Sequence, residues 1–342
     1  MTKPAQPLLA KAIIAAAALM MVAGADRPAP AAEPTAASLR LKWFGQAQFI
    51  GYYVAKAKGF YAAEGIDLAI NPGGPNIIAE NLVGAGSDTF GHGGGAASLL
   101  QAREKGLTIV GIGMMFQETP YRFVALERSG IRTFADLRGR KISTWFTGPQ
   151  FMLYAMLKQN GIPLSEVKIE AQAASMTPFL EGQVDLAIVT VFNELLTLKR
   201  RGVTPSVIFN PAEMGVNLPN EALIVNEKIA KENPKLVQGF LKASLHGWAH
   251  ALGHQEEAVD ILVKEVPNAN RAEQLEQLKS LAPLVVYGEA RKKGVGYIDR
   301  KQLEFTERFL LENGVLKSSV DVASAIDTGF WDNVPAADKV VP

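Results

Sequence analysis

The sequence predicts an α/β protein of two lobes, each built on a mainly parallel sheet flanked by helices. Strand-like and helix-like segments alternate through most of the chain, and such alternation is typical of parallel sheets with helices on both faces. The alternation starts a second time at Gly139. A length of 342 residues and a hydrophobic content of 48% are sufficient for two compact cores.

The first lobe is predicted to begin with a strand over 39–44, a helix over 49–64 and a strand over 66–71. Apolar residues every three or four positions predict the helices, and continuous apolar runs predict buried strands. The segments expected next are a helix over 76–83, a helix over 96–104 and a buried strand over 108–114.

The second lobe shows the same alternation. Its expected strands cover 123–126, 141–144, 167–170, 185–189 and 207–209, and its expected helices cover 150–160 and 178–181. After one more strand over 223–226, apolar spacing predicts helices almost to the C-terminus.

The order of these segments predicts a discontinuous first lobe over 38–119 and 211–342, and a second lobe over 120–210. The chain then crosses between the lobes twice, near 117–120 and 210–219. Two crossings form a hinge, and a hinge allows the lobes to close on a ligand.

The N-terminal residues 1–37 are predicted to form a secretory signal and a linker. Lys3 and Lys11 precede an apolar run over 12–23, and Ala- and Pro-rich sequence follows through Ala37. This run is shorter than the roughly 20 residues that span a bilayer. We therefore expect export to the periplasm, with an uncleaved membrane anchor as the alternative.

Composition excludes several classes of function. The chain has no cysteine, which rules out disulfides, cysteine nucleophiles, thiolate metal sites and a lipid-modified cysteine after the signal. A net charge of +1, from 35 basic and 34 acidic residues, does not favour nucleic acid or anionic membranes. No nucleophile elbow, HExxH pair or kinase motif occurs. We predict no catalytic residue, no metal, no cofactor and a monomer.

The turn after the first strand carries the motif Trp43-Phe44-Gly45-Gln46-Ala47-Gln48. Open α/β sheets bind ligands outside the carboxyl ends of their strands. Trp43 offers a stacking face there, and Gln46 and Gln48 offer directional hydrogen bonds. These three residues are predicted to bind ligand, although an apolar core role for Trp43 is the simpler alternative.

The second lobe repeats this design after the strand over 141–144, where Trp145 and Phe146 precede Gly148 and Gln150. If both turns face one cleft, Trp43 and Trp145 hold a planar ring from opposite sides. Trp145 and Phe146 are therefore predicted to bind ligand, with ordinary core packing as the alternative for Trp145.

Further candidates follow other strands. Asn193 and Glu194 come after the strand over 185–189, and Glu194 can accept hydrogen bonds from a ring N–H or cap the next helix. Gly93 and Gly94 lie in a glycine-rich loop that lacks the lysine of a phosphate-binding loop. We expect that loop to present backbone N–H groups to a ligand. Gln117 belongs to the predicted hinge and completes the set.

A row of histidines provides the main competing signal. His246, His250 and His254 are spaced four residues apart and share one helix face, where they can bind a metal. Gly247 and Gly253 are expected to interrupt this helix, and a solvated face explains the row equally well. A metal-dependent enzyme is thus an alternative function.

Four segments together resemble one family: WFGQAQFIGYYVAKAKGFYAAEGID, residues 84–90 with their following glycines, DLRGRKIS at 136–143 and VFNELLTLKRRG at 191–202. The chain resembles the periplasmic solute-binding proteins of ABC importers, in the branch that includes thiamine-pyrimidine-precursor, sulfonate and nitrate binders. The resemblance implies a type II-like two-lobed receptor without catalytic activity, which delivers its ligand to a permease and ATPase complex at the inner membrane. It also implies ligand contacts at Trp43, Gln48, Trp145, Asn193 and Glu194.

The expected ligand is a small planar nitrogen heterocycle similar to the thiamine pyrimidine precursor. Amides and a carboxylate between aromatic rings suit a neutral or weakly basic ring better than nitrate or a sulfonate. Arg122 is the residue that would favour such an anion instead, and an anion receptor is the first alternative. A sensor that presents its ligand to a receptor is a further one. Pyrimidine-synthesising relatives use a cysteine-rich iron motif, which a chain without cysteine does not contain.

Overall fold

The computed structural model describes residues 1–2 and 33–341. Most of the segment expected to be a secretory signal lies outside these residues. From Pro34 onward the chain forms one compact unit. Within the described part of the chain, no helix combines the length and the apolar character needed to cross a membrane.

The first sheet has the strand order β2-β1-β3-β10-β4. Its strands are β1 (Thr35–Leu41), β2 (Ile66–Asn71), β3 (Phe90–His92), β4 (Ile109–Phe116) and β10 (Asn220–Asn226). β1 is parallel to β2 and β3, whereas β10 is antiparallel to both β3 and β4. Four strands therefore run in one direction and β10 runs in the other. β1 begins before the expected strand and leaves 42–46 free to form a turn.

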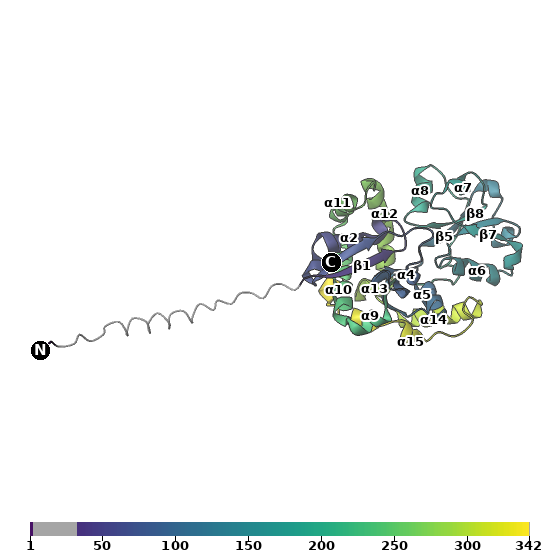
Figure 1. Ribbon diagram of the computed structural model, residues 1–342. Coiled ribbons are helices and arrows are strands. Elements are labelled where there is room, and N and C mark those ends of the chain that lie inside the picture. The colour runs from purple at the N-terminus through teal and green to yellow at the C-terminus, as the bar shows by residue number, and fades with distance from the viewer. Residues whose placement is uncertain (3–32, 342) are drawn as a thin grey trace. The chain divides into compact units, whose positions relative to one another are not determined.

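The second sheet has the strand order β7-β6-β8-β5-β9 and the same layout. Its strands are β5 (Tyr121–Ala125), β6 (Lys141–Thr144), β7 (Lys168–Ala171), β8 (Leu186–Thr190) and β9 (Val207–Phe209). Only β5 runs against the other four strands. Two such sheets, each flanked by helices (Figure 1), confirm the predicted two-lobed α/β class.

Short helices connect the strands. They are η1 (Ala47–Phe49), α2 (Ile50–Ala57), α3 (Phe60–Ala63), α4 (Ala79–Gly84), α5 (Ala96–Glu104), η2 (Glu127–Ser129), η3 (Phe134–Leu137), α6 (Gln150–Gln159), η4 (Leu164–Glu166), α7 (Thr177–Leu180) and α8 (Glu194–Arg200). The single helix expected over 49–64 was wrong. Gly59 adopts φ 74°, a left-handed conformation that separates α2 from α3.

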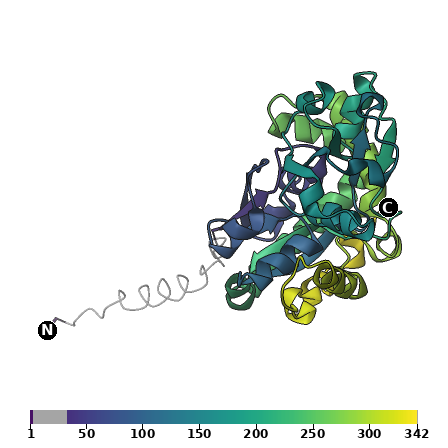
Figure 2. The ribbon, with the colours of Figure 1, turned by 90° about the vertical axis from the view of Figure 1, so that its right-hand side faces the viewer.

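The C-terminal part is helical, as predicted. It contains α9 (Glu227–Glu232), α10 (Pro234–Gly253), α11 (Gln255–Glu265), α12 (Arg271–Val285), α13 (Ala290–Lys293), α14 (Arg300–Glu312), α15 (Val322–Ala325), α16 (Thr328–Asp332) and η5 (Ala336–Asp338). α10 and α11 pack on α2, and α14 packs on α5 (Figure 2). Most of this helical part thus covers elements attached to the first sheet.

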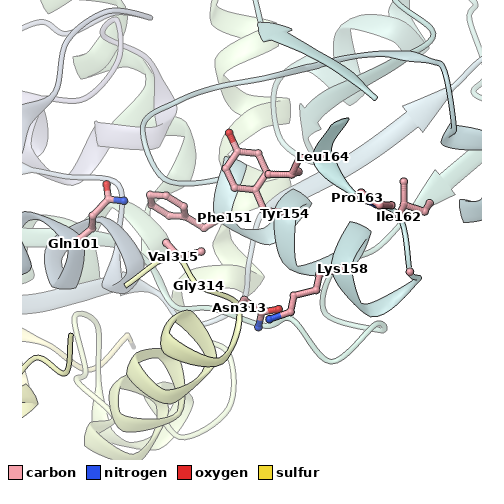
Figure 3. Close-up of a pocket in the computed structure, with 11 residues that line it drawn as sticks. Gln101, Phe151, Tyr154, Lys158, Ile162, Pro163, Leu164, Asn313, Gly314 and Val315 are labelled. Atoms are coloured by element: carbon pink, nitrogen blue, oxygen red, sulfur yellow. The ribbon is translucent and has the colours of Figure 1, made fainter. Parts of the chain in front are cut away.

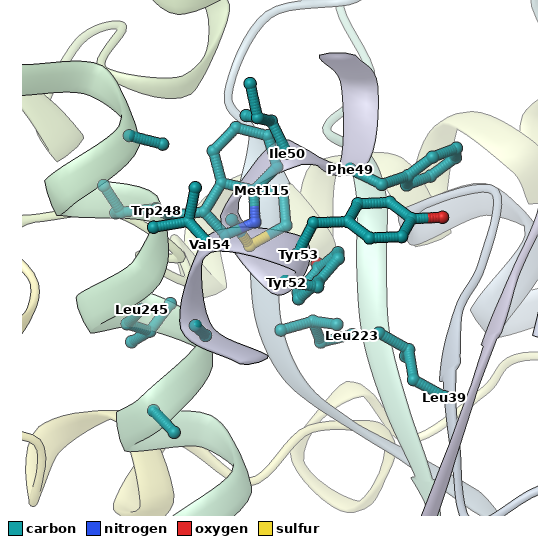
Figure 4. Packing of buried hydrophobic residues seen from close by; sticks show 14 of the residues in the cluster. Leu39, Phe49, Ile50, Tyr52, Tyr53, Val54, Met115, Leu223, Leu245 and Trp248 are labelled. Atoms are coloured by element: carbon teal, nitrogen blue, oxygen red, sulfur yellow. The ribbon is translucent and has the colours of Figure 1, made fainter. Parts of the chain in front are cut away.

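The crossing of α2 and α10 is unusually close. A Cβ atom on Gly51 would lie 2.2 Å from Trp248, and one on Gly247 would lie 2.2 Å from the carbonyl oxygen of Gly51. Figure 4 shows Trp248 packed among Ile50, Val54 and other buried side chains of this core. The expectation that Gly247 interrupts the helix was wrong, because α10 continues through it and needs a glycine at the crossing.

The chain passes between the sheets at 117–120, after β4, and again at 210–219, before β10. Gln117 anchors the first connection: its side-chain amide donates to the carbonyl oxygens of Met114, at 2.7 Å, and Tyr297, at 2.8 Å. The connection is therefore tied to the first lobe and to the C-terminal helices.

Candidate functional site

A pocket lies where the carboxyl ends of strands from both sheets meet. Its volume is about 30 Å³. The turn after β1, the turns after β6 and β8, and the start of β5 contribute its walls. It is lined by Lys42, Trp43, Gln46, Gln48, Tyr121, Trp145, Thr147, Thr190, Phe192, Asn193 and Glu194.

The structure brings together most of the residues that the sequence nominated. Those that line the pocket are Trp43, Gln46, Gln48, Trp145, Asn193 and Glu194. Those that lie outside its lining are Gly93, Gly94, Gln117 and Phe146. Gln117 serves the connection between the lobes, and Phe146 is 47% exposed beside the pocket.

The indoles of Trp43 and Trp145, one from each lobe, touch directly. Their ring centroids are 5.7 Å apart and their planes meet at 66°, an edge-to-face arrangement. A flat ligand enters between them only if the two rings separate. The buried Nε1 of Trp145 has no hydrogen-bond partner among the described residues, so this indole retains an unused donor.

Behind the glutamines lies a buried charged cluster centred on Glu221, which the sequence analysis missed. One carboxylate oxygen of Glu221 accepts from Lys42, and the other accepts from Gln48, at 2.9 Å, and contacts His92 Nε2. His92 Nδ1 in turn lies 2.7 Å from the hydroxyl of Tyr52. The one visible signal was a single glutamate ahead of the apolar run of β10.

This cluster fixes the charges in the wall of the pocket. Burial raises the pKa of Glu221, but Lys42 and His92 outweigh it and bring this pKa to about 2. Burial opposes the charge of Lys42, yet Glu221 and Tyr121 hold its pKa above the usual range. The pKa of His92 is lowered, mainly by burial, so its imidazole is neutral. Lys42 and Glu221 thus form a buried ion pair.

The carboxylate of Glu221 also orients both glutamines. Because a carboxylate only accepts, Gln48 must donate its NH₂ group to it. The carbonyl oxygen of Gln48 then accepts from the NH₂ group of Gln46, at 2.7 Å. The side-chain oxygen of Gln46 is the acceptor that this chain of bonds leaves unused among the described residues.

Glu194 begins α8 and lies in the pocket wall. One of its oxygens accepts from the backbone N–H and the hydroxyl of Thr190, at 2.9 and 2.7 Å, and the other accepts from Asn193, at 2.8 Å. Burial raises its pKa, and these hydrogen bonds oppose the rise only in part. Its side-chain hydrogen bonds thus run back to Thr190 and Asn193 and not to the following turns of α8, so the structure shows no helix cap by its side chain, and its role as a ligand acceptor stays a prediction.

The glycine loop does not present free N–H groups as expected. The N–H of Gly93 donates to the carbonyl of Ala222, at 2.8 Å, and that of Gly94 donates to the buried carboxylate of Glu80, at 2.9 Å. A Cβ atom on Gly94 would lie 2.2 Å from the carbonyl oxygen of Thr147 in the second lobe. This glycine allows the lobes to approach each other.

Arg122 lies outside the pocket lining. Its guanidinium donates to the carbonyl oxygens of Thr119, at 3.1 Å, and Tyr121, at 2.8 Å, and lies 3.8 Å from Glu118. The charge that would favour an anion is therefore occupied elsewhere.

The histidines of the row do not converge: His246 and His250 lie in α10, whereas His254 lies between α10 and α11. His246 stacks on Phe60 with centroids 4.0 Å apart, whereas His250 Nε2 lies 2.8 Å from Glu257. His254 donates to the backbone oxygen of His250, at 3.1 Å. In the part of the chain that the structure describes, no group of three or more histidines and carboxylates is placed to hold a metal.

A larger groove of about 610 Å³ lies between α5, α6 and the end of α14 (Figure 3). Phe151, Tyr154 and Val315 give it a largely apolar lining, and its one cation, Lys158, donates to the main-chain oxygen of Glu312. None of the residues that the sequence nominated lines this groove. We therefore take the pocket lined by the two indoles as the candidate functional site.

The architecture is the periplasmic binding protein fold, which solved structures share. The nitrate-binding protein NrtA of Synechocystis superposes with a TM-score of 0.67 at 16% identity, covering 91% of each chain. The alkanesulfonate-binding protein SsuA of Xanthomonas axonopodis, bound to MOPS, gives a TM-score of 0.65 at 17% identity over 87% of this chain and 99% of its own. Residues 46–258 match the family described as NMT1/THI5 like, and the chain belongs to this family. The predicted resemblance is thus confirmed.

Relatives in sequence include binding proteins and enzymes. The riboflavin-binding protein RibY of Chloroflexus aurantiacus is 30% identical, over 89% of this chain and 88% of its own. A formylaminopyrimidine-binding protein of Halalkalibacterium halodurans is 27% identical, over 67% and 70%. A 4-amino-5-hydroxymethyl-2-methylpyrimidine phosphate synthase of Legionella pneumophila is also 27% identical, over 67% and 73%.

Proposed function

We propose that this protein is the extracytoplasmic receptor of an ABC importer and captures a small planar nitrogen heterocycle between its lobes. One observation carries the proposal: an indole from each lobe meets its counterpart over a pocket whose walls hold buried amides and a carboxylate. Aromatic faces bind flat rings, and fixed amides and carboxylates read the polar edge of such a ring. The receptor acts as a monomer in the periplasm and passes its ligand to a permease and ATPase complex.

The relatives support a ligand that contains a pyrimidine ring. One is named for riboflavin, whose flat ring system includes a fused pyrimidine, and another for formylaminopyrimidine. A thiamine pyrimidine precursor and a flavin share this ring and differ in the size of what is attached to it. Phe44 and Phe146, 49% and 47% exposed, each follow one of the two indoles and offer apolar surface for a larger ring system.

A calorimetric titration of the purified protein tests the proposal. The panel consists of hydroxymethylpyrimidine, riboflavin, taurine and nitrate, each titrated into wild type and Arg122→Ala. We expect a heterocycle to bind with micromolar or tighter affinity and the variant to bind it equally well. Binding of the anions alone, lost in Arg122→Ala, would overturn the proposal in favour of the anion receptor.

A synthase is the second candidate function, because some relatives carry that name. Against it, the two pocket carboxylates are engaged by protein donors, Glu221 by Lys42 and Gln48, and Glu194 by Thr190. We expect a bound heterocycle to be recovered chemically unchanged after prolonged incubation. Mass spectrometry of the released ligand checks this, and a converted product would favour the enzyme.

A further inference from the structure

Three side chains of the pocket lining, Lys42, Tyr121 and Trp145, carry unused hydrogen-bond donors, and Gln46 and Glu194 carry unused acceptor oxygens. Lys42 has three N–H groups, of which one donates to Glu221 and one to the hydroxyl of Tyr121, at 3.1 Å. Lys42 is 8% exposed and lines the pocket, and its third N–H has no partner among the hydrogen bonds of the described residues. An ammonium cannot accept a hydrogen bond, so the ligand atom beside it must be an acceptor.

Two further donors lie in the same wall. The hydroxyl of Tyr121 accepts from Lys42, which leaves its own O–H to donate. The buried Nε1 of Trp145 has no partner among the described residues, and an indole N–H only donates. Both side chains line the pocket. An exocyclic amine placed against these groups would leave donor facing donor.

Glu194 supplies a matching acceptor. One of its oxygens already accepts two hydrogen bonds from Thr190, whereas the other accepts one from Asn193 and retains a lone pair. A ring N–H between two carbonyl groups gives this acceptor a donor and offers two acceptors to the donors elsewhere in the lining. This is the edge of a cyclic imide.

The donor group of Lys42 is held in the pocket wall by Glu221. Glu221 is fully buried and adopts φ 64°, a left-handed conformation that side chains rarely take. Its carboxylate holds Lys42 and Gln48 in place, and His92 supports it from behind. Turning Lys42 away would leave the buried carboxylate of Glu221 without its cation, which is strongly unfavourable.

Building on the proposed function, we propose that the site selects heterocycles with a cyclic imide edge, as in a pyrimidine-2,4-dione, and that Lys42, held by Glu221, rejects aminopyrimidines. The pair is electrically neutral, so it favours a neutral carbonyl group without drawing in anions. Lys42 is then the residue that determines specificity, and Glu221 is a positioning residue.

The test compares ligands that differ only at this edge. Full-length protein is titrated calorimetrically with thymine against 5-methylcytosine and with riboflavin against 3-methylriboflavin, in which the imide N–H is blocked. We expect the imide to bind at least about tenfold more tightly in each pair that binds, because a hydrogen bond to a charged group contributes about 1.5 kcal/mol or more. Equal or tighter binding of the amino or methylated partner would overturn this inference alone. Absence of binding by every heterocycle would overturn the proposed function as well.

Variants then assign the preference to Lys42. Lys42→Met combined with Glu221→Gln removes the pair without leaving a buried charge, and we expect the preference for the imide to fall below about threefold. The matched control is Lys58→Met with Glu257→Gln, which removes an exposed pair with a 2.7 Å contact and should retain the full preference. If the buried double variant does not fold, Tyr121→Phe keeps the ring and loses the hydroxyl, both as a donor to the ligand and as an acceptor that positions Lys42. It should weaken imide binding several-fold, and an unchanged preference in the variant that folds would overturn the assignment.

Discussion

Two buried carboxylates, Glu221 and Glu194, sit at the pocket with opposite electrostatic behaviour. Glu221 faces a cation, which lowers its pKa despite burial. Glu194 receives hydrogen bonds only from neutral donors, so burial raises its pKa. One carboxylate is therefore fixed in its charged form by the fold, whereas the other is costly to ionise and gains most from an N–H donor on a ligand.

Lowering the pH should destabilise the protein through Glu221. Its folded pKa of about 2 lies below the 4.5 of the unfolded chain, so its contribution is complete above pH 4.5 and disappears as the pH falls toward 2. The full contribution is on the order of 3 kcal/mol. His92, whose pKa is also lowered, adds a loss of stability that begins as the pH falls below the ordinary histidine value of 6.5. Urea unfolding of wild type and Glu221→Gln at pH 5 and pH 3 measures the effect. A variant as pH-dependent as wild type would contradict the assignment to Glu221.

Glu194→Gln should separate binding from stability. Because the pKa of Glu194 is raised in the folded protein, ionising this carboxyl destabilises the fold. The destabilisation is present at neutral pH and disappears once the pH falls below the pKa of the unfolded chain. The variant should therefore melt at the same or a higher temperature at pH 7. It should bind the heterocycle about tenfold or more weakly, because a charged acceptor is lost. Calorimetry and thermal melting check both expectations. Normal affinity with reduced stability would show that Glu194 only anchors the start of α8 to Thr190.

Sequence position identified the pocket residues that directly follow strands, but it did not identify the buried ion pair of Lys42 and Glu221. Trp43 and Trp145 stand out as large aromatic residues after strands. Lys42 and Glu221 are separated by 179 positions and form a pair only because β1 and β10 belong to one sheet. Neither residue has a local spacing that indicates its partner.

At the scale of elements, the pocket depends on which strand ends share an edge. The start of β10 lies opposite the end of β4, with Asn220 paired to Phe116, and the start of β5 lies opposite the end of β8, with Tyr121 paired to Thr190. The single reversed strand of each sheet thus brings Glu221 and Tyr121 to the edge where the parallel strands end. If β10 and β5 ran parallel to their neighbours, these two residues would lie at the opposite edge of each sheet.

Gly94→Ala should prevent full closure while leaving the first lobe folded. The added Cβ would lie 2.2 Å from the carbonyl oxygen of Thr147, a backbone atom of the opposite lobe that cannot move by itself. We expect at least a tenfold loss of affinity and a smaller rise in melting temperature on adding ligand. Gly113→Ala is the matched control, because its nearest atom would be 3.5 Å away. Undiminished affinity in Gly94→Ala would show that ligand binding does not require this contact.

At the scale of the whole molecule, contacts between α8 and α12 connect the two lobes beside the pocket. Arg200 bonds to Glu276 at 2.8 Å at the surface, whereas the buried Gln277 donates to Asn193 at 3.0 Å. Arg200, Glu276 and Gln277 lie outside the pocket lining, so we expect them to influence binding by holding the lobes together.

The two contacts should differ in strength. Exposed ion pairs contribute at most about 1 kcal/mol and are screened by salt, so Arg200→Ala should weaken binding less than about fivefold, and the difference should vanish at about 0.5 M salt. Gln277→Ala removes a buried partner of Asn193 and should cost more at either ionic strength. Calorimetric titration of both variants at low and high salt distinguishes them. A larger loss from Arg200→Ala would place the main closing contact at the surface.

The sequence by itself determined the two-lobed α/β class, the helical C-terminal part and six residues of the pocket lining, because each is written in local periodicity or in position after a strand. Only the tertiary structure decided that Trp43 meets Trp145 edge to face, that Gly94 serves lobe contact, and that Glu221 holds Lys42. These features depend on strand order and on the approach of distant segments, which local sequence patterns do not encode.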